Sequence, residues 1–140
     1  SLHEVHVRGT FLVCRAVGRT MQAQRRGTII NIASVLGHIA AKNVAPYAAA
    51  KAAIVQLTKV LALEFAEHGI RVNSIAPGYI DTPLTRQHAS DVRERITRTT
   101  PLGRFGEARE LIGPVVFLAS EASSFITGSS LIVDGGWTAQ

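Results

Sequence analysis

Residues 27–34 read GTIINIAS, a run that is almost continuously apolar instead of alternating between apolar and polar positions. Such a run is typical of a strand that is buried on both faces of a parallel sheet. Two further runs have the same character, IRVNSIAP from Ile70 and SSLIVDGG from Ser129. We therefore predict three strands of one parallel sheet.

The segments between these runs have the periodicity of helices. Apolar residues recur at helical spacing over residues 9–24, 46–68 and 107–120. Strands that alternate with helices form right-handed crossovers, which place the helices on both faces of one sheet. The sequence thus predicts an α/β fold with a doubly wound parallel sheet, here three strands with flanking helices. We expect Asn43 to cap the second helix, Pro46 to lie near its first position, and Pro114 to kink the third helix.

The composition of the 140 residues excludes several classes of protein. The single cysteine rules out an internal disulfide and a thiolate metal cluster, so a reducing, cytoplasmic location is expected and no metal site is predicted. No apolar run reaches the length of a membrane span. The net charge of +5 comes from scattered basic residues without interleaved aromatic side chains, which favours a solvated surface over a nucleic-acid site.

The polar residues that could take part in binding or catalysis lie at one edge of the predicted sheet. Ser34 follows the first strand, the Pro77–Gly78 turn follows the second, and Tyr47 and Lys51 lie in the first turns of the helix between them. Ligands of open α/β sheets bind beyond the carboxyl ends of the strands. We therefore predict the functional site at this edge.

Tyr47 and Lys51 are four residues apart, so they share one face of a helix. An ammonium close to a phenol stabilises the phenolate, and a tyrosine tuned in this way can act as an acid or a base near neutral pH. The hydroxyl of Ser34 could stabilise the charge that develops when a carbonyl becomes an alkoxide. These three side chains are the candidate catalytic residues.

Several segments, in this order along the chain, resemble the C-terminal part of the short-chain dehydrogenase/reductase family of Rossmann-fold oxidoreductases. They are GTIINIAS, YAAAK, LTKVLALEFAEHGIRVNSIAPG and FLASEASSFITGSSLIVDGG. The resemblance implies an NAD(P)-dependent enzyme that interconverts a carbonyl and a secondary alcohol by hydride transfer. It implies that Tyr47 is the proton donor or base and that Ser34 holds the substrate oxygen. Lys51 would bind the nicotinamide ribose and favour the ionised form of Tyr47.

The same resemblance assigns the loop PGYIDTPL to the cofactor. Pro77, Gly78 and the backbone of Ile80 would meet the nicotinamide carboxamide, with the hydroxyl of Thr82 nearby. Residues 83–100 resemble the family's mobile substrate lid, although the arginines within it, such as Arg93 and Arg98, are expected to be solvated.

His6 stands where the family commonly has an asparagine that holds a proton-relay water. An imidazole also bonds water and titrates near neutral pH, so a relay and a purely structural role both stay open.

The chain contains no Gly-x-Gly-x-x-Gly or Gly-x-x-x-Gly-x-Gly run and does not begin with methionine. We therefore expect residues 1–140 to be a single partial domain, the C-terminal part of an NAD(P)-binding Rossmann fold, and to be inactive alone. The choice between NAD and NADP stays open.

The resemblance is strongest to 3-oxoacyl-[acyl-carrier-protein] reductases, with sugar or polyol dehydrogenases of the gluconate type as the alternative. Arg25 and Arg26 could dock an acidic carrier protein in the first case. A non-catalytic binding protein is a further alternative. Members of this family usually form oligomers, so the resemblance implies a homodimer or homotetramer. Its interfaces would be formed by the first two helices and the last strand, with Trp137 beyond that strand.

Overall fold

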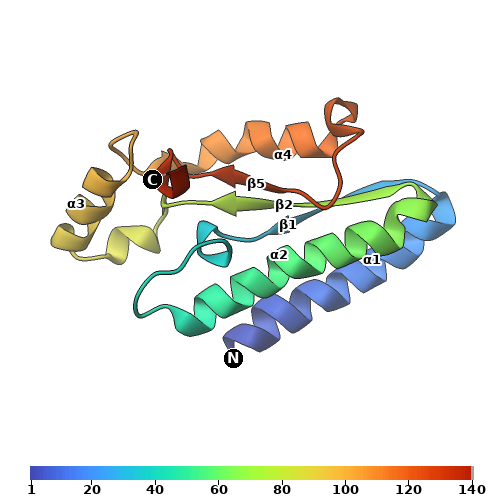
Figure 1. The fold of residues 1–140 in the computed structure, drawn as a ribbon, viewed down its shortest axis with the longest axis horizontal. Coiled ribbons are helices and arrows are strands. Elements are labelled where there is room, and N and C mark those ends of the chain that lie inside the picture. Colours follow the sequence, from blue (N-terminus) through green and yellow to red (C-terminus); the bar gives the residue numbers. More distant parts are fainter. Residues whose placement is uncertain (140) are drawn as a thin grey trace.

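A computed structural model describes residues 1–139 as a three-stranded parallel sheet between layers of helices (Figure 1). The strands β1 (Gly27–Ile32), β2 (Ile70–Pro77) and β5 (Ser130–Val133) lie in the order β1-β2-β5. Gly27 of β1 pairs with Ile70, and Ser74 of β2 pairs with Ser130. The predicted strands and their parallel arrangement are confirmed.

The helices lie on both faces of this sheet, as predicted. Helices α1 (Thr10–Gln24) and α2 (Ala45–Phe65) run side by side on one face, and α4 (Ile112–Ala119) covers the other (Figure 1). Helix α3 (Ser90–Thr99) lies beyond the carboxyl ends of the strands. No helix in residues 1–139 is long and apolar enough to cross a membrane.

The core lies between the sheet and the pair α1 and α2. A cluster of buried side chains joins these elements: Cys14, Ile29, Leu61, Ala62, Phe65, Ile70 and Val72. Gly18 of α1 allows the helices to approach, because a Cβ atom there would lie 2.5 Å from the ring of Phe65. This packing fixes α2, and with it Tyr47 and Lys51, against β1.

Burial on both faces is observed for β2 alone. Six of the eight residues of β2 are buried, whereas most residues of β1 and β5 are partly exposed, and Ile32 is 55% exposed. The prediction was wrong for β1 and β5 because each is an edge of the described sheet and has a neighbouring strand on one side only.

Helix boundaries differ from the prediction in two places. Helix α1 is preceded by a π-helical segment, Glu4–Gly9. Val44, not Asn43, is the N-cap of α2, and Asn43 has a left-handed φ of 64°. An asparagine tolerates this conformation better than most residues, which explains its place in the turn. Pro46 lies in the first turn of α2, as expected.

The third predicted helix is divided. Residues Ala108–Leu111 form a 3₁₀ turn, and Pro114 is the third residue of α4, where a proline is tolerated because it lies in the first turn. The sequence did not predict a second, two-stranded parallel sheet of β3 (Ile80–Asp81) and β4 (Gly106–Glu107). These strands of two residues are too short to produce a recognisable pattern.

Candidate active site

Ser34 lies at the carboxyl end of β1, where it begins a short 3₁₀ turn, Val35–Gly37. Its side chain is buried, and its Oγ accepts a hydrogen bond of 3.2 Å from the backbone N–H of Leu36. This bond uses an acceptor site of the hydroxyl and leaves its proton available to donate. Ser34 is therefore a held hydrogen-bond donor at the edge of the sheet.

Tyr47 and Lys51 lie in the first turns of α2, next to this turn. Lys51 is 6% exposed, and its Nζ donates a hydrogen bond of 2.9 Å to the carbonyl oxygen of Ile32. The same Nζ lies 5.7 Å from the centre of the Tyr47 ring. Burial of the ammonium lowers the pKa of Lys51. The ammonium is thus fixed between the end of β1 and the half-buried phenol.

His6 faces the same group from the π-helical segment. Its ring is perpendicular to that of Tyr47, with 6.0 Å between the ring centres. Burial, and secondarily the charge of Lys51, lower the pKa of His6, so the neutral imidazole is favoured at neutral pH. His6 and Lys51 both line an open groove of about 470 Å³ along β1. The structure therefore brings His6, Tyr47 and Lys51 together.

The loop after β2 is held from two sides. The backbone N–H of Gly78 donates to the carbonyl of Val133, and a Cβ atom at Gly78 would lie 2.7 Å from that of Asp134, so only glycine fits this approach. The next residue, Tyr79, packs edge-on against the rings of Phe105 and Trp137. Pro77 ends β2, so the loop leaves the sheet at the same edge as Ser34.

Thr82 belongs to a local network with Thr85. The backbone N–H of Thr82 donates to Thr85 Oγ1 at 2.8 Å, and the backbone N–H of Thr85 donates to Thr82 Oγ1 at 3.2 Å. The Thr85 hydroxyl also donates to the carbonyl of Ile80 at 2.7 Å. These bonds hold the Ile80–Thr85 loop in one shape, with Thr82 part of its internal bonding.

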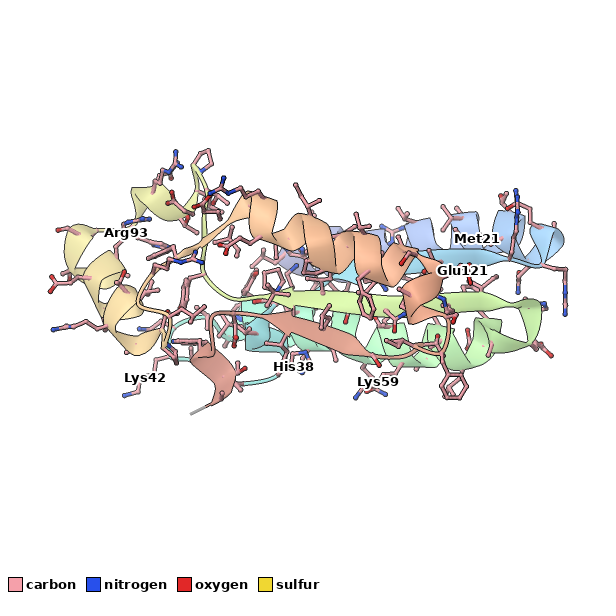
Figure 2. The ribbon with its side chains drawn as sticks, turned by 90° about the horizontal axis from the view of Figure 1, so that it is seen from above. Met21, His38, Lys42, Lys59, Arg93 and Glu121 are labelled. Atoms are coloured by element: carbon pink, nitrogen blue, oxygen red, sulfur yellow. The ribbon has the colours of Figure 1, made fainter. Side chains whose placement is uncertain are left out.

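Arg93 is not a solvated lid residue, and the prediction for it was wrong. It extends from α3 (Figure 2), where its guanidinium lies 3.1 Å from a carboxylate oxygen of Asp81 and 4.2 Å from the centre of the Phe105 ring. Asp81 also pairs with Arg86 at 2.9 Å. Hydrogen bonds from Arg86 first, and from Arg93, lower the pKa of Asp81. Asp81 and Arg93 are 12 residues apart and belong to different elements, so no helix or strand pattern in the sequence indicates that they meet. Sequence reasoning therefore missed this cluster.

Lys51 and Tyr47 could hold part of a cofactor at this edge. Lys51 uses one of its three N–H groups on Ile32, which leaves two for a ligand, and the Tyr47 hydroxyl adds a donor and acceptor beside them. Such groups suit the hydroxyls of a ribose. No three His, Cys, Asp or Glu side chains within residues 1–139 are arranged to hold a metal ion.

Comparison with known proteins gives a consistent result. The family model described as enoyl-(acyl carrier protein) reductase matches residues 1–138. The chain is 42% identical to gluconate 5-dehydrogenase of Gluconobacter oxydans over 98% of its length and 54% of that protein. It is also 42% identical to the 3-oxoacyl-[acyl-carrier-protein] reductase FabG of Thermotoga maritima, over 94% of its length and 54% of that protein.

A solved structure is similar over the same region. The crystal structure of a gluconate 5-dehydrogenase from Burkholderia cenocepacia in complex with NADP and tartrate superimposes with a TM-score of 0.96 and 43% sequence identity. The match covers 99% of this chain and 55% of that one. The chain therefore spans about half the length of the relatives that it matches.

Proposed function

Because the chain belongs to the short-chain dehydrogenase/reductase family, we propose that residues 1–140 form the C-terminal part of the NAD(P)-binding domain of an oxidoreductase. This enzyme interconverts a carbonyl and a secondary alcohol. The bound nicotinamide dinucleotide, NAD or NADP, supplies or accepts the hydride. The observation that carries the proposal is the buried Lys51 ammonium, fixed 5.7 Å from the Tyr47 ring in a helix that the Ser34 turn approaches closely.

Tyr47 is the proposed acid and base. In carbonyl reduction its hydroxyl donates a proton to the oxygen that becomes the alcohol, and in oxidation its phenolate removes that proton. The nearby charge of Lys51 stabilises the phenolate that each cycle forms.

Ser34 is the proposed donor to the substrate oxygen. Because its Oγ already accepts from Leu36, the hydroxyl proton can point to the substrate. A fixed donor stabilises the alkoxide more than a mobile one, since it needs no reorganisation during the reaction.

Lys51 and Tyr47 also form the proposed ribose site, and Pro77, Gly78, Ile80 and Thr82 form the proposed nicotinamide site.

His6 is the proposed route by which protons from the Lys51 and Tyr47 pair exchange with solvent. Support for this role is the neutral imidazole 6.0 Å from the Tyr47 ring. His6→Leu should then slow turnover, whereas the exposed His3→Leu should not; equal rates in both variants would leave His6 structural.

Two substrate classes fit this chemistry, a carrier-linked 3-oxoacyl thioester and a sugar acid or polyol. Similarity to FabG of Thermotoga maritima supports the first class, and similarity to two gluconate 5-dehydrogenases supports the second. A carrier docked on Arg25 and Arg26 would have to span the sheet, because these residues precede β1 whereas Ser34 follows it. Arg25 is also committed locally, since its guanidinium donates to the carbonyl of Glu67 at 2.7 Å. Arg26 lines an open groove with Met21 and Glu121. Figure 2 shows Met21 and Glu121 on the side of the molecule opposite Arg93.

We also propose that the enzyme is a cytoplasmic homodimer or homotetramer. Support comes from apolar side chains that α1 and α2 leave exposed, including Phe11, Val13 and Leu63. Light scattering on the full-length protein tests the assembly, and a monomer at all micromolar concentrations would contradict it.

The chain contains two tyrosines, so the test of function has a matched control. Tyr47→Phe in the full-length protein should lower turnover by roughly 10²–10⁴-fold, the usual contribution of a positioned general acid, while the dissociation constant of the cofactor rises much less, because Lys51 still binds the ribose. Tyr79→Phe, which keeps the ring packing of the loop, should retain most of the activity.

Turnover is measured by absorbance of the reduced nicotinamide with a 3-oxoacyl thioester and with gluconate as parallel substrates. A Tyr47→Phe variant that retains activity would contradict the assignment. A wild-type protein that binds NAD or NADP but turns over no carbonyl or alcohol would favour the non-catalytic alternative.

A further inference from the structure

The turn that carries Ser34 touches α2 through the backbone of Gly37. A Cβ atom at Gly37 would lie 2.8 Å from the carbonyl carbon and oxygen of Lys51, and 3.1 Å from the backbone nitrogen of Ala52. Ordinary van der Waals contact begins at about 3.5 Å. The missing side chain therefore allows the turn to rest directly on the helix backbone at Lys51.

The backbone conformation does not require glycine at this position. The φ angle of Gly37 is not in the left-handed region, so alanine could adopt it without strain. Closeness to Lys51, and not conformational freedom, is thus what excludes a side chain. An alanine here would have to push the turn and the helix apart by more than half an ångström.

The turn is the more pliable of the two partners. It is a single 3₁₀ turn, closed by the hydrogen bond of 2.9 Å from the Gly37 N–H to the carbonyl of Ser34, whereas α2 is a helix of 21 residues packed into the core. Because this bond ties Gly37 directly to Ser34, a displacement of the turn moves Ser34 relative to Tyr47 and Lys51.

We propose that Gly37 is a positioning residue that sets the distance between Ser34 and the pair Tyr47 and Lys51. The inference rests on the proposed function, since it assigns Gly37 an effect on catalysis through Ser34. The distance from Ser34 to Tyr47 and Lys51 then depends on the contact between the backbone of Gly37 and the backbone of α2.

The test compares Gly37→Ala with Gly113→Ala in the full-length enzyme. Gly113 lies in α4, and within residues 1–139 no neighbouring atom lies within 4 Å of a Cβ atom there, so its substitution adds the same methyl group without a clash. Gly37→Ala should lower kcat by about 10–100-fold, as a misplacement approaching 1 Å can, with the cofactor dissociation constant unchanged. Gly113→Ala should leave both values as they are.

A double-mutant cycle with Ser34→Ala separates positioning from general damage. If Gly37 acts through Ser34, Gly37→Ala should cost less than about threefold in kcat in the Ser34→Ala background, because the displaced group is already gone. An equal cost in both backgrounds, or a Gly37→Ala enzyme with wild-type kcat, would overturn the proposal. A Ser34→Ala enzyme with wild-type kcat would also overturn the proposal. The Tyr47→Phe variant tests the proposed function separately.

If Gly37→Ala does not fold, Val35→Ala replaces it in the same cycle. Val35 is 2% exposed and anchors the same turn in the core, so its truncation loosens the turn without adding an atom. A smaller loss of kcat that vanishes in the Ser34→Ala background supports the proposal. An unchanged kcat in a folded Val35→Ala enzyme overturns it.

Discussion

Two regions of the molecule hold their polar side chains by different means. At the junction of β1 and α2, Ser34 and Lys51 are 7% and 6% exposed and bond to backbone groups. In the α3 segment, residues 81–105, Asp81 binds Arg86 and Arg93 through ion pairs whose side chains are 30% to 63% exposed. One region is fixed by burial and backbone contacts, and the other by charges near solvent.

This difference has a physical consequence for function. Exposed ion pairs contribute little to stability and weaken with salt, whereas buried hydrogen bonds in a packed interior change little. The junction can therefore keep a preorganised constellation while the α3 segment shifts at low cost. We propose that the α3 segment acts as a cover over the junction, which would exclude water after substrate binds.

The largest expected effect concerns both regions at once. The 140-residue chain alone should show no binding of NADH or NADPH in isothermal titration and no turnover, because neither region provides a glycine-rich turn for the pyrophosphate. Contacts to the ribose and the carboxamide alone do not offset the cost of immobilising the cofactor. Saturable micromolar binding by the folded chain would contradict this prediction.

Within the junction, Lys51→Met should damage two functions of the full-length enzyme. The same ammonium is proposed to bind the ribose and to stabilise the Tyr47 phenolate, so the cofactor should bind more weakly and turnover should fall by roughly 10²-fold or more. Lys59→Met, an exposed change on the same helix, is the control. Unchanged affinity and an unchanged pH profile of turnover would reduce Lys51 to a structural lysine.

The junction was also the region whose structure the sequence predicted best. The apolar strand GTIINIAS, the spacing of Tyr47 and Lys51, and Pro46 in the first turn are local signals, and each predicted the element in which it lies. The α3 segment was not accessible in this way. Asp81, Arg93 and Phe105 meet through tertiary contacts without a periodic pattern, and Gly37 is explained only by its distance to the backbone of Lys51.

For the α3 segment, Asp81→Asn should raise the KM of the substrate severalfold while kcat changes less. The substitution removes the charged partner of Arg86 and Arg93 but leaves Arg93 bonded to the carbonyl of Thr85 and stacked on Phe105. Added salt should raise the wild-type KM more than that of the variant, because it screens the pairs that the variant lacks. Asp91→Asn, an exposed change on α3, is the control, and the same KM and salt dependence in all three proteins would sink the idea.

The smallest expected effect is at the border of the α3 segment, where Glu110 joins it to the 3₁₀ turn before α4. Its carboxylate accepts two bonds of 2.7 Å from Arg104 and one of 2.8 Å from the N–H of Glu107. The Arg104 bonds first, and the Glu107 bond next, lower the pKa of Glu110 from 4.5 to about 2. Because the folded protein holds this carboxylate ionised more strongly than the unfolded chain does, the contribution is complete above pH 4.5 and is lost as the pH falls to about 2.

Glu110→Gln should therefore lower the urea midpoint of the full-length protein slightly at pH 7, and the difference from wild type should shrink below pH 4.5. The effect is small because water and salt screen this exposed pair. Glu121→Gln, at the other end of α4, controls for the loss of one negative charge. A difference between wild type and Glu110→Gln that is as large at pH 2 as at pH 7 would show that the carboxylate acts through its shape and not through its charge.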